Sequence, residues 1–377
     1  MKNTLLLSLM KIINLSNSIC KLTFNLIFNL SKSNDIRFFA IGKDITKTDQ
    51  QGIETRAKRT QRLLDNDFKP VDVLKELYNS VINPTEKKID LAIDTTNWKT
   101  RGKDTNILMI SAIIPKKDIA FPIVYKDLNK AGNPNCEEKV EIVKQCIEII
   151  PPEDINYILC DGAFLGSQFV HFLHDTSINF IIRIRTNMKF VISGEECVTK
   201  DLFDDLKLKE HRLFATYYYG ICIHLIGLKY RNDKGNEELL IIMTNDRLST
   251  ADLILKKYRK RWKIETLFGY YKTRGFNIEN SKTTSSKRIE NLIFLMSLSM
   301  LLIFKMAEKY KNRIYNKKNS ESQNYTYSFF RIGIEAIKQY FSDFLYIINS
   351  IFELIESFYL EKTSIYKQKL KAVYNYS

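Results

Sequence analysis

The stretch YRKRWKIETLFGYYKTRGF, Tyr258 to Phe276, carries the pattern that decides the predicted fold. It is dense in cations and aromatic residues, yet it holds a single carboxylate, Glu265. A helix that only faces solvent does not need one acid in so basic a segment. A metal site facing a phosphate backbone does, because a carboxylate binds the metal while cations neutralise phosphates.

Helical spacing places four polar residues of this stretch together. A long helix is predicted to open at Ser249 or Thr250, and at about 100° per residue a band roughly 60° wide on it holds Tyr258, Arg261, Glu265 and Lys272. The apolar residues fall on another face, about 100° away, which predicts packing against a sheet. Tyrosine, arginine and lysine suit phosphate oxygens. The alternative is a solvated charge stripe in which Arg261 and Glu265 pair, worth about 0.3–0.5 kcal/mol.

Two further carboxylates follow apolar runs upstream. Asp94 ends the apolar part of KIDLAIDTT (88–96), and Asp161 ends that of INYILCDGAF (155–164). Ligands of α/β sheets gather beyond strand ends, so these acids and Glu265 form a candidate hard-oxygen site for Mg²⁺ or Mn²⁺. Two such ions about 4 Å apart would activate a nucleophile and stabilise a leaving oxygen on phosphorus. Taken singly, either aspartate also fits an ordinary turn at a strand end.

The order of predicted elements indicates an α/β fold. It comprises three strands (88–96, 106–115, 119–128), a helix (135–150), a strand (155–164), a short helix (166–175) and a strand (178–185). The first three strands are predicted to form an antiparallel meander and the later ones right-handed crossovers. Residues 187–240 break this order with alternating strand-like pieces and an NDKGN turn, which predicts a β-rich insertion.

Helical regions are predicted on both sides of residues 88–305, which we expect to form the catalytic domain. Residues 1–87 have helical periodicity and a basic segment, TRAKRTQRLL (55–64), which makes DNA binding their candidate function. Residues 306–377 contain a loop-rich stretch (308–326) followed by amphipathic helices, the candidate site of dimerisation.

No membrane span is expected. The start MKNTLLLSLMKII imitates a signal peptide, but Lys11 interrupts its apolar run, so an amphipathic helix is predicted. The apolar run 292–304 is shorter than the roughly 20 residues that span a bilayer, which predicts a buried core helix.

Composition favours an anionic partner. The chain of 377 residues has 58 Lys+Arg against 43 Asp+Glu, a formal net charge of +15. Nucleic acid is the first expectation for such a balance and an anionic membrane the second. The 6 cysteines form no CxxC pair, which argues against a structural zinc site and a disulfide framework, and predicts a reducing, cytoplasmic compartment.

The motifs together resemble a known family. The spacing Tyr258-x2-Arg261-x3-Glu265-x6-Lys272 is similar to the Y-R-E-K signature of bacterial and archaeal insertion-sequence DDE transposases, the class with a β-rich insertion before the catalytic Glu. The segments AIDTT and CDGAFLGSQFVHFL, with INFIIRIRTN after the second, look like the family's two Asp motifs. The resemblance covers about residues 88–305, more than half of the chain.

The resemblance implies a ribonuclease-H-like catalytic fold with a catalytic and metal-binding triad of Asp94, Asp161 and Glu265. It also implies two Mg²⁺ or Mn²⁺ ions, terminal inverted repeats and target DNA as substrates, and a homodimer in the DNA complex. Trp262 lies beside the polar stripe, where it would either stack on a displaced base, worth about 1–3 kcal/mol, or pack on the protein. The rival functions are a decayed or domesticated copy that only binds DNA, and a related metal nuclease that does not join strands.

Overall fold

The chain forms two compact units in a computed structural model that describes residues 53–65, 74–75, 78, 88–100, 102–114, 119–314 and 328–340. One unit, here named the sheet unit, comprises Ile82–Gly269 and Thr283–Glu290. The other, here named the helical unit, comprises Met1–Val81, Tyr270–Lys282 and Asn291–Ser377.

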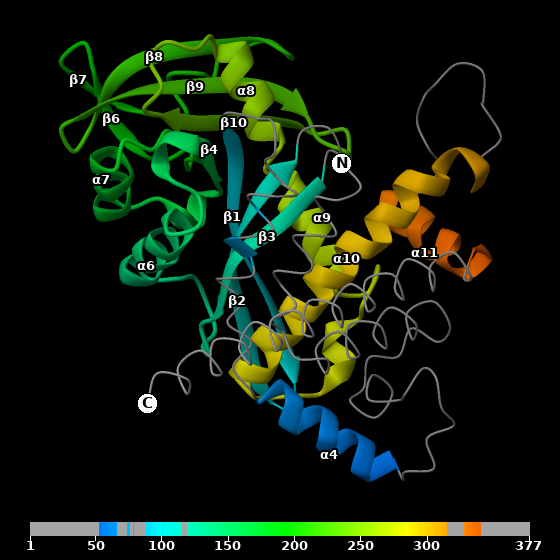
Figure 1. Ribbon diagram of the computed structural model, residues 1–377. Helices are drawn as coiled ribbons and strands as arrows, with labels where there is room; N and C mark the ends of the chain where they lie inside the picture. The colour runs from blue at the N-terminus through cyan, green and yellow to red at the C-terminus, as the bar shows by residue number, and fades with distance from the viewer. Residues whose placement is uncertain are drawn as a thin grey trace, which may run out of the picture. The chain divides into compact units, whose positions relative to one another are not determined.

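One 8-stranded mixed sheet, in the order β3-β2-β1-β4-β5-β10-β9-β8, forms the centre of the sheet unit (Figure 1). Its first strands are β1 (Ile89–Thr100), β2 (Lys103–Ile114), β3 (Ile119–Asp127), β4 (Ile155–Cys160) and β5 (Phe180–Arg183). The first three form the predicted antiparallel meander, and β4 pairs in parallel with both β1 and β5. The mixed α/β prediction is therefore confirmed, and this sheet is consistent with the expected ribonuclease-H-like domain.

Two helices connect these strands where the sequence predicts them: α6 (Cys136–Ile147) and α7 (Ser167–Asp175). Asn135 and Glu138 form a capping box that begins α6, and Pro151 and Pro152 follow it. In Figure 1 both helices lie on one side of β1 and α9 on the other. The side chains of β2 are buried without interruption from Thr105 to Ile113, which is typical of a sheet covered on both faces.

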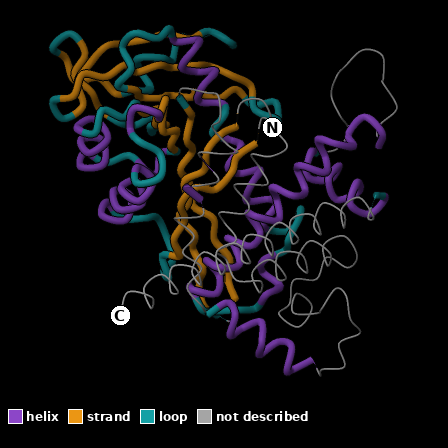
Figure 2. Tube along the Cα trace, in the orientation of Figure 1, coloured by secondary structure: helices purple, strands orange, loops and turns teal. Residues whose placement is uncertain are grey.

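The segment between β5 and the next helix is rich in strands, as predicted. The strands β6 (Lys189–Ile192) and β7 (Glu195–Val198) form a separate hairpin. The strands β8 (His211–Tyr218), β9 (Ile221–Arg231) and β10 (Glu237–Thr244) instead extend the main sheet, because β10 pairs antiparallel with β5. Figure 2 shows these strands as one curved layer.

Three helices lie wholly or mainly in the described part of the helical unit: α4 (Ile53–Leu64), α10 (Ser286–Ile314) and α11 (Phe329–Gln339). The Asn291 side-chain amide of α10 donates a hydrogen bond to the Leu64 carbonyl at the end of α4, at 2.8 Å. The rings of Tyr270 and Phe330 stack with their centroids 4.7 Å apart. Predicted helices in residues 1–52 and 341–377 lie outside the described residues.

The helix α10 continues to Ile314, so the loop predicted from residue 308 begins too early. The reason is that Met306, Ala307 and Tyr310 are buried and extend the apolar side of the helix. Among the described residues, one helical segment, Ser286–Lys311, is long and apolar enough to cross a membrane, although most of it is buried within the protein. Length and composition of this kind are shared by core helices, so they assign no membrane.

Candidate active site

The helix predicted to carry the polar stripe is two helices. The first, α8 (Ala251–Arg259), begins at Thr250, whose hydroxyl accepts a hydrogen bond from the Leu253 amide, and the second is α9 (Trp262–Tyr271). Between them the backbone hydrogen bonds join residues three positions apart, as in a 3₁₀ turn. The Arg261 amide, for example, donates to the Tyr258 carbonyl at 2.9 Å. The single long helix that was predicted is therefore interrupted at residues 260 and 261, and that part of the prediction is wrong.

Strand register places the two aspartates side by side. The parallel pairing of β1 with β4 ends at Ile93 opposite Cys160, so the next residues along the two chain segments are Asp94, still in β1, and Asp161, directly after β4. The prediction that Asp94 ends its strand is wrong, because β1 continues to Thr100 in its pairing with β2. The pairing of β1 with β4 ends just before Asp94, at Ile93. Beyond this point the two chain segments separate, which is where ligands of α/β sheets commonly bind.

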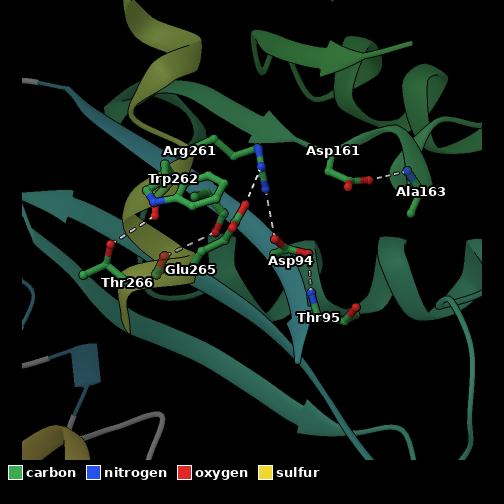
Figure 3. Close-up of polar contacts among 10 residues, drawn as sticks. Asp94, Thr95, Asp161, Ala163, Arg261, Trp262, Glu265 and Thr266 are labelled. Atoms are coloured by element: carbon green, nitrogen blue, oxygen red, sulfur yellow. Dashed lines mark hydrogen bonds and ion pairs between the residues drawn. The ribbon is translucent and has the colours of Figure 1, made fainter. Parts of the chain in front are cut away.

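Arg261 joins two of the three predicted acids. Its guanidinium donates to Asp94 at 3.0 Å and to Glu265 at 2.6 Å (Figure 3). The side chains of Arg261 and Asp94 are 13% and 17% exposed, so both charges are largely removed from water. The i,i+4 pair that the sequence offered as an alternative thus exists, and in addition it holds α9 against β1.

Burial raises the pKa of Asp94 to about 6. The Thr95 amide and Arg261 lower this pKa, while the charges of Asp161 and Glu265 raise it further. Asp94 is therefore close enough to both Asp161 and Glu265 for their charges to act on it. A buried acid whose neighbours do not offset its burial is a frequent feature of functional sites.

Asp161 occupies the turn that follows β4. Its carboxylate accepts a hydrogen bond from the Ala163 amide at the start of a short 3₁₀ turn (Gly162–Phe164) (Figure 3). The carbonyl of the same Ala163 accepts a hydrogen bond from Lys139 of α6 at 2.7 Å. Lys139 could not be predicted as part of the site from the sequence, because its spacing on α6 is that of an ordinary amphipathic helix.

The predicted DNA-contacting residues have different environments. Tyr258 is 7% exposed, and its buried hydroxyl has no hydrogen-bond partner among the described residues. Burial raises the pKa of Tyr258 to about 12. Trp262 is 62% exposed at the first turn of α9, so the packed alternative for its ring is wrong. Lys272 lies in the turn after α9 and belongs to the helical unit, and burial lowers its pKa.

A second acid on β1, Asp90, contacts the junction between α8 and α9. It was not predicted from the sequence. Asp90 is 4% exposed and accepts hydrogen bonds from Lys260 at 2.7 Å, Lys257 at 3.3 Å and Asn156 at 2.7 Å. Asp90 and Asp94 are four residues apart on one face of a strand. The alternation in KIDLAID was the available signal for this second acid.

The donor chemistry of the site fits a divalent cation. Three carboxylates provide the hard oxygen ligands that Mg²⁺ and Mn²⁺ prefer, and the pairing of Asp94 with Arg261 does not fully offset the burial of its carboxylate. Tyr258 adds a buried hydroxyl that has no hydrogen-bond partner in the described part of the chain. Within the described ranges, however, no three His, Cys, Asp or Glu side chains are already arranged around a common metal position. Arg261 stands between Asp94 and Glu265, where it supplies the positive charge.

Comparison with known proteins identifies a family. Residues 86–302, more than half of the chain, match the family described as "Transposase DDE domain". No curated protein is significantly similar to the chain. A crystal structure of an endonuclease V from Bacillus subtilis is similar at 13% identity, over 64% of this chain and 95% of that one, with a TM-score of 0.27. A similarity with so low a TM-score supports no conclusion about either chain.

Proposed function

Because the chain belongs to the transposase DDE domain family, we propose that it cuts DNA at the ends of an insertion sequence and joins those ends to target DNA. The family supports a DNA substrate and metal-dependent nucleotidyl transfer in general terms. We propose, more specifically than the family match, that the chain is of the class with the Y-R-E-K signature and that its catalytic domain is ribonuclease-H-like. The observation that carries it is the register that sets Asp94 and Asp161 at neighbouring strand positions, next to the helix bearing Glu265.

In this proposal, Asp94, Asp161 and Glu265 hold two divalent ions, Mg²⁺ or Mn²⁺. When bound, the ions lower the pKa of an attacking water or hydroxyl and stabilise the leaving oxygen on phosphorus. The protein itself positions the acids and removes them from bulk water, so that little side-chain acid–base chemistry is required. Asp94 comes from β1, Asp161 from the turn that follows β4, and Glu265 from α9.

The cations and aromatic residues around these acids are assigned to the DNA. Arg261 suits a backbone phosphate because its guanidinium donates two parallel hydrogen bonds. In the structure those donors face Asp94 and Glu265, so DNA and metal binding would transfer Arg261 from carboxylates to phosphate. The Tyr258 hydroxyl is assigned to a phosphate oxygen, Lys272 to a backbone charge, and the exposed Trp262 ring to stacking on a displaced base.

We further propose a homodimer that acts within a complex of terminal inverted repeats and target DNA. Its compartment would be the prokaryotic cytoplasm, in association with the nucleoid. The candidate dimerisation region, residues 306–377, and the candidate DNA-binding region, residues 1–87, lie mostly outside the described residues.

The test uses labelled DNA that carries the terminal repeats flanking the gene. With Mg²⁺ or Mn²⁺ we expect nicked and joined products. With Ca²⁺ we expect assembly without cutting, because Ca²⁺ binds at about 2.3–2.6 Å instead of 2.0–2.1 Å and with looser geometry. Binding without cutting in every metal would identify an inactive DNA-binding copy, and nicking without joining would identify a nuclease. Efficient cutting in EDTA would overturn the metal mechanism.

A further inference from the structure

Lys139 is a buried cation that the proposed mechanism does not use. It lies on the inner side of α6 and is 7% exposed. Burial lowers the pKa of Lys139, while the nearby Asp161 charge acts in the opposite direction. A buried charge of this kind is unfavourable unless its interactions compensate for the lost hydration. Its location therefore calls for a role other than solubility.

The contacts of Lys139 lead to Asp161 through the backbone of one residue, Ala163. The ammonium donates to the Ala163 carbonyl at 2.7 Å and lies 5.6 Å from the centre of the Phe164 ring. The Ala163 amide in turn donates to the Asp161 carboxylate. The turn after β4 is thus held at its carbonyl by α6, and the amide of the same residue fixes the direction of the Asp161 side chain.

We propose that Lys139 is a positioning residue that orients Asp161 for metal binding by holding the backbone of Ala163 in place. This inference rests on the proposed function, because it presumes that Asp161 is a metal ligand. Lys139 is not assigned to the reacting atoms, since its ammonium faces a backbone carbonyl. Residues that orient a metal ligand commonly change metal affinity by about 10–100-fold when they are replaced.

The test compares Lys139→Met with Lys144→Met in the full-length protein. Methionine keeps the length and apolar stem of Lys139, and Lys144 is an exposed lysine on the same helix. Mn²⁺ affinity is measured without DNA by electron paramagnetic resonance, and cleavage is measured as a function of Mn²⁺. We expect Lys139→Met to weaken Mn²⁺ binding by about 10-fold or more. Saturating Mn²⁺ should restore most of the cleavage rate, DNA affinity should be unchanged, and Lys144→Met should match the wild type.

Asp161→Asn separates failure of this inference from failure of the proposed function. If Asp161→Asn binds Mn²⁺ and cuts DNA as the wild type does, the role of Asp161 is wrong and the proposed site fails with it. If Asp161→Asn loses both while Lys139→Met binds Mn²⁺ normally, only the role of Lys139 is overturned. A lower rate of Lys139→Met at saturating Mn²⁺, with normal affinity, would also overturn it. Should Lys139→Met not fold, as thermal unfolding would show, Lys139→Gln replaces it in the same measurements.

Discussion

At the scale of single residues, the site contains more negative charge than its surroundings stabilise. Burial raises the pKa of Asp94 to about 6 although Arg261 lies within 3.0 Å of its carboxylate. A buried and incompletely compensated carboxylate lowers the stability of the unbound protein. It also increases the affinity for any cation that replaces Arg261. In the proposed function, activity and stability would therefore place opposite demands on Asp94, which is a common trade-off at functional sites.

The first prediction concerns Asp94→Asn in metal-free buffer. The pKa of Asp94 is about 6 in the folded protein and about 3.9 in an unfolded chain, so the contribution of this group to stability is lost as pH rises through 6. We expect Asp94→Asn to raise the free energy of unfolding at pH 8 by up to about 3 kcal/mol and to have less effect at pH 5. Urea unfolding at both values checks this, with the exposed Asp233→Asn as control. A variant less stable than the wild type at pH 8 would show that Arg261 outweighs burial.

The second prediction concerns Arg261→Gln. In the free protein this change removes the cation between Asp94 and Glu265, so Mn²⁺ should bind more tightly than to the wild type. On DNA the same change removes a phosphate contact, so the slope of log affinity against log salt should fall by about 0.9. Lys260→Gln, which removes an equal charge from the pair with Asp90, is the matched control for Mn²⁺ binding. Weaker Mn²⁺ binding by Arg261→Gln than by the control would refute the proposal that Arg261 moves from the carboxylates to a phosphate when metal and DNA bind.

At the scale of secondary-structure elements, two acids of β1 fix the junction of α8 and α9. Asp90 holds Lys260, and Asp94 holds the next residue, Arg261. Two consecutive residues, Lys260 and Arg261, are thereby bound to β1. The junction between the helices allows this because its hydrogen bonds join residues three positions apart. The position of Glu265, four residues farther on, follows from these ties.

The third prediction tests this junction through Asp90→Ala. The change leaves Lys257 and Lys260 without their shared carboxylate, and we expect a loss of about 2 kcal/mol in the free energy of unfolding. The control is Asp104→Ala, because Asp104 pairs with Lys99 at 3.7 Å and is 37% exposed, so its loss should cost at most about 1 kcal/mol. Chemical denaturation measures both. Equal effects of the two changes would deny Asp90 its anchoring role.

The sequence predicted elements well where a local pattern decides them. The five strands of the first part of the sheet follow apolar runs, and Pro151 marks the end of a helix. The prediction from the sequence failed where contacts between residues far apart in the chain determine the structure. The break after Arg259 depends on pairs with β1, and nothing in the local spacing of Lys139 shows that it reaches Ala163. Residue types therefore singled out Asp94, Asp161, Glu265 and Arg261 as candidates, but not Asp90 or Lys139, whose contacts lie far along the chain.

At the scale of the whole molecule, a net charge of +15 makes salt-dependent DNA binding the expected behaviour. The candidate DNA contacts are divided between the two units, since Arg261 belongs to the sheet unit and Lys272 to the helical unit. The family match, residues 86–302, also includes parts of both. Both units are therefore expected to contribute to binding of the element's ends.

The fourth prediction is that Lys272→Ala lowers the salt slope of end binding by about 0.9 without changing Mn²⁺ affinity in the absence of DNA. The matched control is Lys338→Ala, which removes a partly exposed lysine of α11 in the same unit. Fluorescence anisotropy over a range of salt concentrations measures the slope. A slope equal to that of the control would remove Lys272 from the DNA interface.

The central claim is that Asp94, Asp161 and Glu265 act together as the metal site for DNA cleavage. The most direct measurement is single-turnover cleavage of labelled terminal-repeat DNA by Asp94→Asn, Asp161→Asn and Glu265→Gln in Mg²⁺ and in Mn²⁺, with DNA affinity measured on the same samples. These changes remove a charge from each side chain while nearly preserving its shape, so folding should persist. We predict that each variant binds the DNA ends about as well as the wild type and fails to cut them. Wild-type cleavage by any one of the three, with either metal, would contradict the assignment.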